Sequence, residues 1–163
     1  MQGERPDIAL PRWESLPDIG LYMDQVVTLM ERAFSPALPK GEMTKSMVNN
    51  YVKVGLIPRP SGKKYDREHL AMLMMIGVLK QALSMESIAQ LLDMLCADGV
   101  RKGYERFCEE AAVVGEALTE GRFGLHPSEC PPKDQALRAG IMAALCTIRT
   151  SRLLNALRGE KNP

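Results

Sequence analysis

Hydrophobic residues recur at helical spacing along most of this 163-residue chain, and the pattern predicts six helices. The expected ranges are 21–34, 45–54, 67–82, 84–95, 100–119 and 133–158, separated by prolines, glycines and polar capping residues. The third range is apolar on nearly all sides, which is typical of a central, buried helix. Met, Leu and Ala are frequent, whereas segments rich in β-branched or aromatic residues are few. We therefore expect a mainly α-helical fold.

Local sequence signals indicate where individual helices begin and end. Thr44 and Asp66 are suitable N-cap residues for the second and third helices, and Ser84 begins the fourth. Gly55 is a favourable residue for the end of the second helix. The first twenty residues contain three prolines and read as an extended arm. We expect the arm to be fastened to the body by Trp13, Leu16 and Ile19.

The segment 56–65 cannot be helical, because Pro58, Pro60 and Gly62 interrupt it. We expect Ile57 and Tyr65 to pair as two short strands around a turn near Ser61 and Gly62. A short two-strand hairpin with basic residues at its tip has the form of a wing beside a DNA-binding helix.

Charge is unevenly distributed, although the net formal charge is only +1. Residues 1–43 carry 4 basic and 7 acidic residues, and residues 70–163 carry 11 of each. Residues 44–69 carry 6 basic and 2 acidic residues, a local net charge of +4. One basic segment in a nearly neutral chain indicates a local anion-binding surface, and a solvated basic face gives the same pattern.

The predicted second helix combines an apolar face with polar side chains that suit base recognition. Met47, Val48, Tyr51 and Val54 share one face, while Ser46, Asn49, Asn50 and Lys53 lie on the others. An asparagine amide pairs bidentately with N6 and N7 of adenine in the major groove. Asparagine is also a poor helix former, so two in succession lower helix stability without an evident structural benefit. We predict that this face contacts bases or phosphates.

Residues 44–92 resemble the DNA-binding domain of the MerR family of bacterial transcription regulators. Four segments in register support the resemblance: Val54-Gly55-Leu56-Ile57-Pro58, Lys64-Tyr65-Asp66, the trio Leu70, Leu73 and Ile76, and Ser84-Met85-Glu86-Ser87-Ile88. The family's usual Arg-Tyr-Tyr triplet in the recognition helix is Asn49-Asn50-Tyr51 in this chain. The segment after Leu95 also lacks the single long, heptad-rich dimerisation helix of many members. The whole chain is similar to a set of uncharacterised bacterial proteins grouped as a domain of unknown function.

The resemblance implies a winged helix-turn-helix that binds double-stranded DNA, and it suggests a division of the chain. Residues 1–20 would form the arm, 21–97 the MerR-like domain, and 98–163 a helical region for dimerisation and possible effector binding. The residues expected to contact DNA are Lys45, Ser46, Asn49, Asn50, Lys53, Arg59, Lys63, Lys64, Tyr65 and Arg67. Since one recognition helix reads few base pairs, a homodimer is expected.

The homodimer needs an apolar seam, and the last helix offers one. The stripe Leu137, Ile141, Leu145 and Ile148 suits this role, although it could equally pack inside the monomer. A protein-interaction module that uses the MerR-like fold without binding DNA is the main alternative function. The acidic first segment and the neutral C-terminal half fit that alternative.

Several other classes of function are disfavoured. No apolar run approaches the roughly 20 residues needed to cross a membrane, and no secretory signal is visible, so we expect a cytoplasmic protein without a membrane partner. The four cysteines are widely spaced and expected to be reduced and metal-free, and the pair His126 and Cys130 is a weak metal candidate. No nucleophile–base pair or glycine-rich phosphate loop is found, so we expect neither an enzyme nor a cofactor.

Overall fold

The computed structural model describes residues 8–34, 38, 43–122 and 131–159. Within these ranges it contains a short 3-10 helix, η1 (Trp13–Ser15), and six α-helices. The α-helices are α1 (Met23–Phe34), α2 (Lys45–Lys53), α3 (Arg67–Leu79), α4 (Met85–Leu95), α5 (Val100–Thr119) and α6 (Pro132–Gly159). The mainly helical prediction is confirmed.

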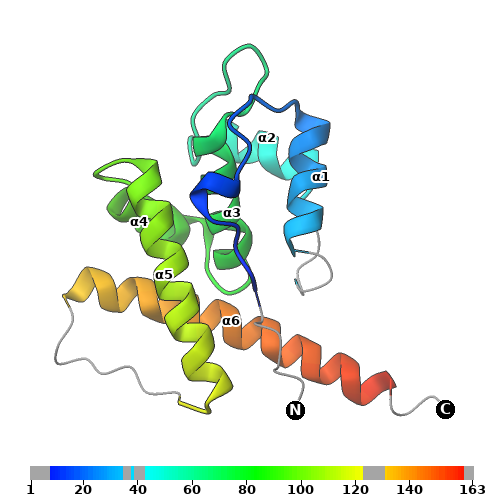
Figure 1. Cartoon of the computed structure of the whole chain (residues 1–163), viewed down its shortest axis with the longest axis vertical. Helices are drawn as coiled ribbons and strands as arrows, with labels where there is room; N and C mark the ends of the chain where they lie inside the picture. Colours follow the sequence, from blue (N-terminus) through cyan, green and yellow to red (C-terminus); the bar gives the residue numbers. More distant parts are fainter. Residues whose placement is uncertain (1–7, 35–37, 39–42, 123–130, 160–163) are drawn as a thin grey trace.

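Helix α3 lies at the centre of the molecule, with α1, α4, α5 and α6 packed around it (Figure 1). Every residue from His69 to Leu79 is buried, as expected for a helix that is apolar on all sides. Helix α1 runs alongside α3, since a Cβ at Gly77 would lie 2.6 Å from the Phe34 ring, and α6 crosses the end of the molecule far from α2 (Figure 1). The central helix thus lies between α2 and α6.

The predicted helix starts are confirmed by side-chain caps. The hydroxyl of Thr44 accepts a hydrogen bond from the Met47 N–H (3.2 Å), and the carboxylate of Asp66 accepts one from the His69 N–H (3.1 Å). The hydroxyl of Ser84 accepts one from the Ser87 N–H (3.2 Å). Each cap satisfies a backbone donor that the first helical turn leaves without a partner.

The N-terminal arm is attached by Trp13 and Leu16, as predicted, but not by Ile19. Trp13 and Leu16 are buried, whereas the Ile19 side chain is 67% exposed. After η1, the backbone of Leu21 pairs with that of Tyr65, and Leu21 is buried in place of Ile19. The hydroxyl of Tyr104 on α5 donates a hydrogen bond to the carbonyl of Pro11 (2.7 Å). The arm thus holds α5 as well as the central helix.

The prediction of a two-strand wing over residues 57–65 is wrong. The described residues contain no β-strand, only the isolated bridges Leu21–Tyr65 and Ser61–Lys64. Both backbone groups of Tyr65 are bonded to Leu21, at 2.9 Å and 2.8 Å, so Tyr65 cannot pair with Ile57. The N–H of Ile57 is directed at the Tyr51 carbonyl (3.3 Å). Pro58 and Pro60 also lack the N–H groups that a ladder requires. The segment is a loop, called the basic loop below (residues 56–65).

The apolar stripe on α6 packs inside the monomer. Leu137, Ile141, Leu145 and Ile148 are all buried, and α6 contacts α3, α4 and α5. Of the two alternatives for this stripe, the structure supports core packing, so a dimer seam has to use another surface. No helix among the described residues is long and apolar enough to cross a membrane.

Close packing of α5 on the end of α4 depends on Gly103, and a substitution there should destabilise the fold. A Cβ at Gly103 would lie 2.6 Å from the carbonyl oxygen of Leu95, a backbone atom that cannot rotate away. We expect Gly103→Ala to lower the free energy of unfolding by about 1–3 kcal/mol. Gly115, on the same helix, is the control, because its Cβ would meet nothing within 4 Å. Gly115→Ala should raise the free energy of unfolding by up to about 1 kcal/mol. Urea titration measures both, and stabilisation by Gly103→Ala would contradict the packing.

Candidate nucleic-acid interface

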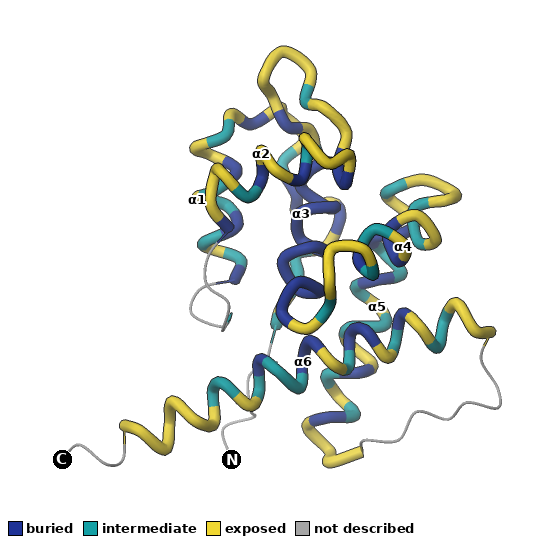
Figure 2. The backbone as a smooth tube through the Cα atoms, turned by 180° about the vertical axis from the view of Figure 1, so that it is seen from behind, coloured by how far each residue is buried: buried dark blue, intermediate teal, exposed yellow. Residues whose placement is uncertain are grey.

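Helix α2 presents a polar face to solvent, as the sequence predicted. Its apolar side is anchored by Val48 and Tyr51, which are 0% and 4% exposed. The candidate DNA-contacting residues on the helix are all exposed: Lys45, Ser46, Asn49, Asn50 and Lys53. Seen from both sides of the molecule, α2 and the basic loop lie at the end opposite α6 (Figures 1 and 2).

The transition from α2 to the basic loop is fixed by Gly55. The N–H of Gly55 donates to the Val52 carbonyl (3.2 Å), and the N–H of Leu56 donates to the Tyr51 carbonyl (2.8 Å). Gly55 has a φ of +77°, and Leu56 and Tyr51 are both buried. This combination is a Schellman motif with its accompanying apolar contact. It turns the chain sharply out of α2, so that the loop begins directly beside the helix.

A tight turn at the tip of the basic loop exposes two lysines. The N–H of Lys64 donates to the Ser61 carbonyl (2.9 Å), and the two residues between them, Gly62 and Lys63, have φ values of +56° and +62°. Positive φ at both central positions is the pattern of a type I′ turn. The turn was predicted at this place, although without the flanking strands it forms only one bridge.

His69 attaches the start of the basic loop to the start of α3. Its Nδ1 accepts a hydrogen bond from the N–H of Asp66 (3.2 Å), which leaves Nε2 to donate to the carbonyl of Pro58 (3.2 Å). Burial acts to raise the pKa of Asp66, but the hydrogen bond from the backbone N–H of His69 helps to outweigh it, and that pKa is lowered. His69 thus completes a capping box with Asp66 at the start of α3, and the residue is buried.

The basic side chains around α2 differ in how far they are engaged within the chain. Lys53, Arg59 and Lys63 are exposed and form no ion pair with any described residue. Lys45 is paired with Asp24, and the ammonium of Lys64 lies 5.3 Å from the centre of the Tyr22 ring. All five remain at the surface, where they could neutralise phosphates.

Two further candidate residues lie within the fold rather than on this surface. Tyr65 is 4% exposed, and its ring packs edge-on against His69. The Arg67 guanidinium lies 5.7 Å from the Trp13 ring centre and 3.8 Å from the Asp18 carboxylate, and its Nε is buried without a hydrogen-bond partner. Arg67 therefore secures the arm. No local pattern indicates this, because Trp13 and Arg67 are far apart in sequence.

The two adjacent asparagines face different surroundings. Asn50 lines a groove of about 450 Å³ between the end of α2 and helix α4, whereas Asn49 does not. The residues of this α2–α4 groove are Asn50, Val54, Gly55, Leu56, Met72, Met85, Glu86, Ala89, Leu92, Asp93 and Cys96. Burial, with the charges of Asp93 and Glu68, raises the pKa of the Cys96 thiol to about 11. The groove therefore has an apolar floor in a negative electrostatic environment.

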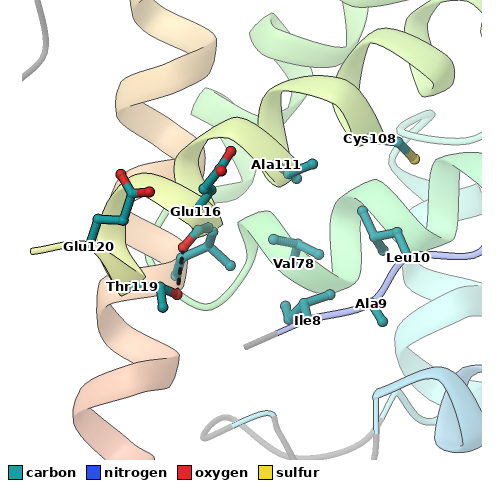
Figure 3. Close-up of a pocket in the computed structure, with 12 residues that line it drawn as sticks. Ile8, Ala9, Leu10, Val78, Cys108, Ala111, Glu116, Thr119 and Glu120 are labelled. Atoms are coloured by element: carbon teal, nitrogen blue, oxygen red, sulfur yellow. Dashed lines mark hydrogen bonds between the residues drawn. The ribbon is translucent and has the colours of Figure 1, made fainter. Parts of the chain in front are cut away.

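A second pocket, of about 490 Å³, lies between the arm and α5 (Figure 3). Ile8 and Leu10 line it from the arm, Val78 from α3 and Leu145 from α6. On α5, small residues make room for it, and two carboxylates border it, Glu116 and Glu120. Among the described residues no cluster of three or more His, Cys, Asp or Glu side chains could hold a metal, and His126 and Cys130 lie outside them.

Comparison with known proteins matches the chain to a family. A family described as a domain of unknown function, DUF1836, matches residues 11–107. No curated protein and no solved structure matches the chain. The matched range extends from the arm into α5, and its ends are joined by the hydrogen bond from Tyr104 to Pro11. The family region thus includes both α2 with the basic loop and the contacts that hold the arm.

Replacing Gly55 tests the Schellman motif that orients the basic loop. A Cβ at Gly55 would meet nothing within 4 Å, so the effect of a side chain there comes from the positive φ alone. We expect Gly55→Ala to lower the free energy of unfolding by about 1–2 kcal/mol. Gly55→Asn should lower it less, since asparagine tolerates this conformation better. Denaturant titration of both variants measures the difference, and equal losses would argue against backbone strain as the cause.

Proposed function

We propose that this chain, which belongs to the DUF1836 family, binds double-stranded DNA and regulates transcription. The observation that carries the proposal is the exposed polar face of α2 beside the basic loop, at one end of the molecule. The MerR resemblance adds the expectation that α2 enters the major groove while the loop contacts the backbone. The loop takes the place of the wing in this arrangement, although it contains no paired strands.

Phosphate binding is assigned to the basic loop and to the lysines of α2. Lys53, Arg59 and Lys63 have no carboxylate partner among the described residues, so no internal ion pair has to be broken before they meet a phosphate. Lys64 contributes a fourth exposed cation. Such contacts release counterions from DNA and provide affinity for any sequence. Lys45 contributes after exchanging Asp24 for a phosphate, a smaller net gain.

Base recognition is assigned chiefly to Asn49, with Ser46 on the same exposed side of α2. Asn49 and Ser46 are three residues apart and therefore neighbours on the helix surface. Asn50 borders the α2–α4 groove, where Glu86 and Asp93 also lie. Phosphates are repelled by these carboxylates, so the duplex should approach α2 from the Asn49 side. This assigns different roles to two residues that the sequence alone treats alike.

A homodimer is part of the proposal, because two α2 helices related by a twofold axis would double the length of DNA that is read. The stripe on α6 is buried in the monomer, so it does not form the seam. Among the described residues after Gly99, the large apolar side chains that are exposed, and so available for a seam, are Val113, Leu153, Leu154 and Leu157.

A protein-interaction module without DNA binding is the second candidate function. The α2–α4 groove favours it, because an apolar groove bordered by carboxylates suits a partner with apolar and basic side chains. Absence of affinity for any duplex at low salt would favour this candidate over the DNA-binding one.

Removing the two lysines at the loop tip should weaken binding to all DNA sequences alike. We expect the double variant Lys63→Gln/Lys64→Gln to reduce the slope of log affinity against log salt by about 0.9 for each lost contact. Glutamine keeps a side chain at the positive-φ position 63, so the turn is altered less than it would be by glycine. Lys102→Gln, an exposed lysine on α5, is the control and should leave the slope unchanged. Fluorescence anisotropy with random duplexes at several salt concentrations measures the slopes.

Replacing Asn49 should reduce the specificity of the chain for a preferred DNA site. After selection of a preferred site from random duplexes, we expect Asn49→Ala to lower affinity for that site by about 1–3 kcal/mol. Affinity for random DNA should change little, and Asn50→Ala should have the smaller effect at both kinds of site. If Asn49→Ala weakens specific and random binding equally, α2 is a phosphate anchor and the assignment of base recognition is wrong.

A further inference from the structure

The C-terminal end of α6 leaves three leucines and Arg158 exposed in the monomer. The side chains of Leu153, Leu154 and Leu157 are 58%, 51% and 57% exposed. Their spacing places them close together on the helix surface. Residues 149–159 contain three arginines and no acidic residue. This end of α6 extends beyond the other helices in both views (Figures 1 and 2).

The α2–α4 groove has the complementary composition. Leu56 and Leu92 form part of its floor, and Val54, 61% exposed, leaves apolar surface at its edge. Glu86 and Asp93 are exposed, lie seven residues apart on α4 and therefore share one face of that helix. Neither carboxylate is paired with a cation among the described residues. The raised pKa of Cys96 reflects burial together with the negative charge around it.

We propose that the end of α6 (residues 151–159) from one copy of the chain docks in the α2–α4 groove of a second copy, and that the exchange is reciprocal. The leucines would cover the apolar floor, and Arg158 would face Glu86 and Asp93. Within one chain this contact is precluded, because α6 crosses the end of the molecule opposite α2 (Figure 1). Reciprocal docking satisfies twofold symmetry, in which each copy supplies both surfaces.

The symmetric arrangement doubles the surface that each copy contributes. Eleven residues line the groove, and nine form the docking end of α6. Since Leu56, Met72 and Leu92 are 8%, 9% and 2% exposed, only part of this set can touch a partner. A single, one-way docking event would involve roughly half as many on each side, so the symmetric arrangement is the better supported of the two.

Docking would act directly on the proposed DNA-binding surface. The groove wall includes Asn50, Val54 and Gly55, the last turn of α2 and its C-terminal cap. An α6 end seated there would fix the distance between the two α2 helices of a dimer. This dimer would be the homodimer of the proposed function. Its role in DNA binding rests on that function, whereas self-association of the chain is measured without DNA.

Charge-reversal variants of the full chain test the interface in sedimentation velocity runs over a range of concentrations. The groove variant is Glu86→Lys/Asp93→Lys, and the end variant is Arg158→Glu. Each alone opposes like charges, so each should raise the dimer dissociation constant by more than about tenfold. An equimolar mixture of the two variants should regain the dimer, because both contacts of the mixed dimer then join opposite charges.

The control is Glu109→Lys/Glu116→Lys, which reverses two exposed carboxylates with the same seven-residue spacing on α5 and should leave the dimer intact. Thermal unfolding of every variant checks that the fold is retained. A wild-type chain that remains monomeric at 25 °C up to about 100 μM, a concentration at which even weak specific dimers form, overturns the proposal. So does a dimer that both variants leave unchanged, or one that the mixture does not restore. DNA binding by a monomeric chain would then leave the proposed function standing without this interface.

Discussion

The structure depends on the need to cover α3 on every side. A helix that is apolar all round is stable in water only when other elements remove it from solvent, and four helices do so here. The first turn of α3, which is capped by Asp66 and His69, continues directly into the buried part of the helix. Segments that are bonded to this turn are therefore held in place by the packing of the core. The hydrogen bond from His69 to the Pro58 carbonyl attaches the basic loop to this turn, and the residues of α3 from Leu70 onward are buried in the core. The position of the candidate DNA-binding surface therefore depends on the packing of the core.

Features set by neighbouring residues could be predicted from the sequence. The caps at Thr44, Asp66 and Ser84 and the exit from α2 at Gly55 each involve groups within five residues of one another. Amphipathic spacing likewise identified the exposed side of α2, since Val48 and Tyr51 can face the core only if Asn49 and Lys53 do not. Helix ranges and the polar face of the candidate site follow from such short-range chemistry.

Features set by contacts between distant segments could not be predicted. Tyr65 has suitable chemistry for a strand beside Ile57, but its backbone is bonded to Leu21. Arg67 belongs to a basic run by sequence, and the position of Trp13 draws it away from that surface. Asn49 and Asn50 are distinguished only by the placement of α4. In each case the decisive partner lies far along the chain, where periodicity and local propensity carry no information.

The arm joins the two ends of the family region through one small aromatic cluster. Trp13 lies between the guanidinium groups of Arg67 and Arg101, at 5.7 Å and 5.9 Å from its ring centre, and is tilted against Tyr104 at 6.3 Å. The contact from Tyr104 to Pro11 spans 93 residues of sequence. Such contacts close late, because long loops must be ordered first. During synthesis, the arm can therefore contact Arg67 as soon as α3 has left the ribosome, whereas its hydrogen bond to Tyr104 has to wait for α5.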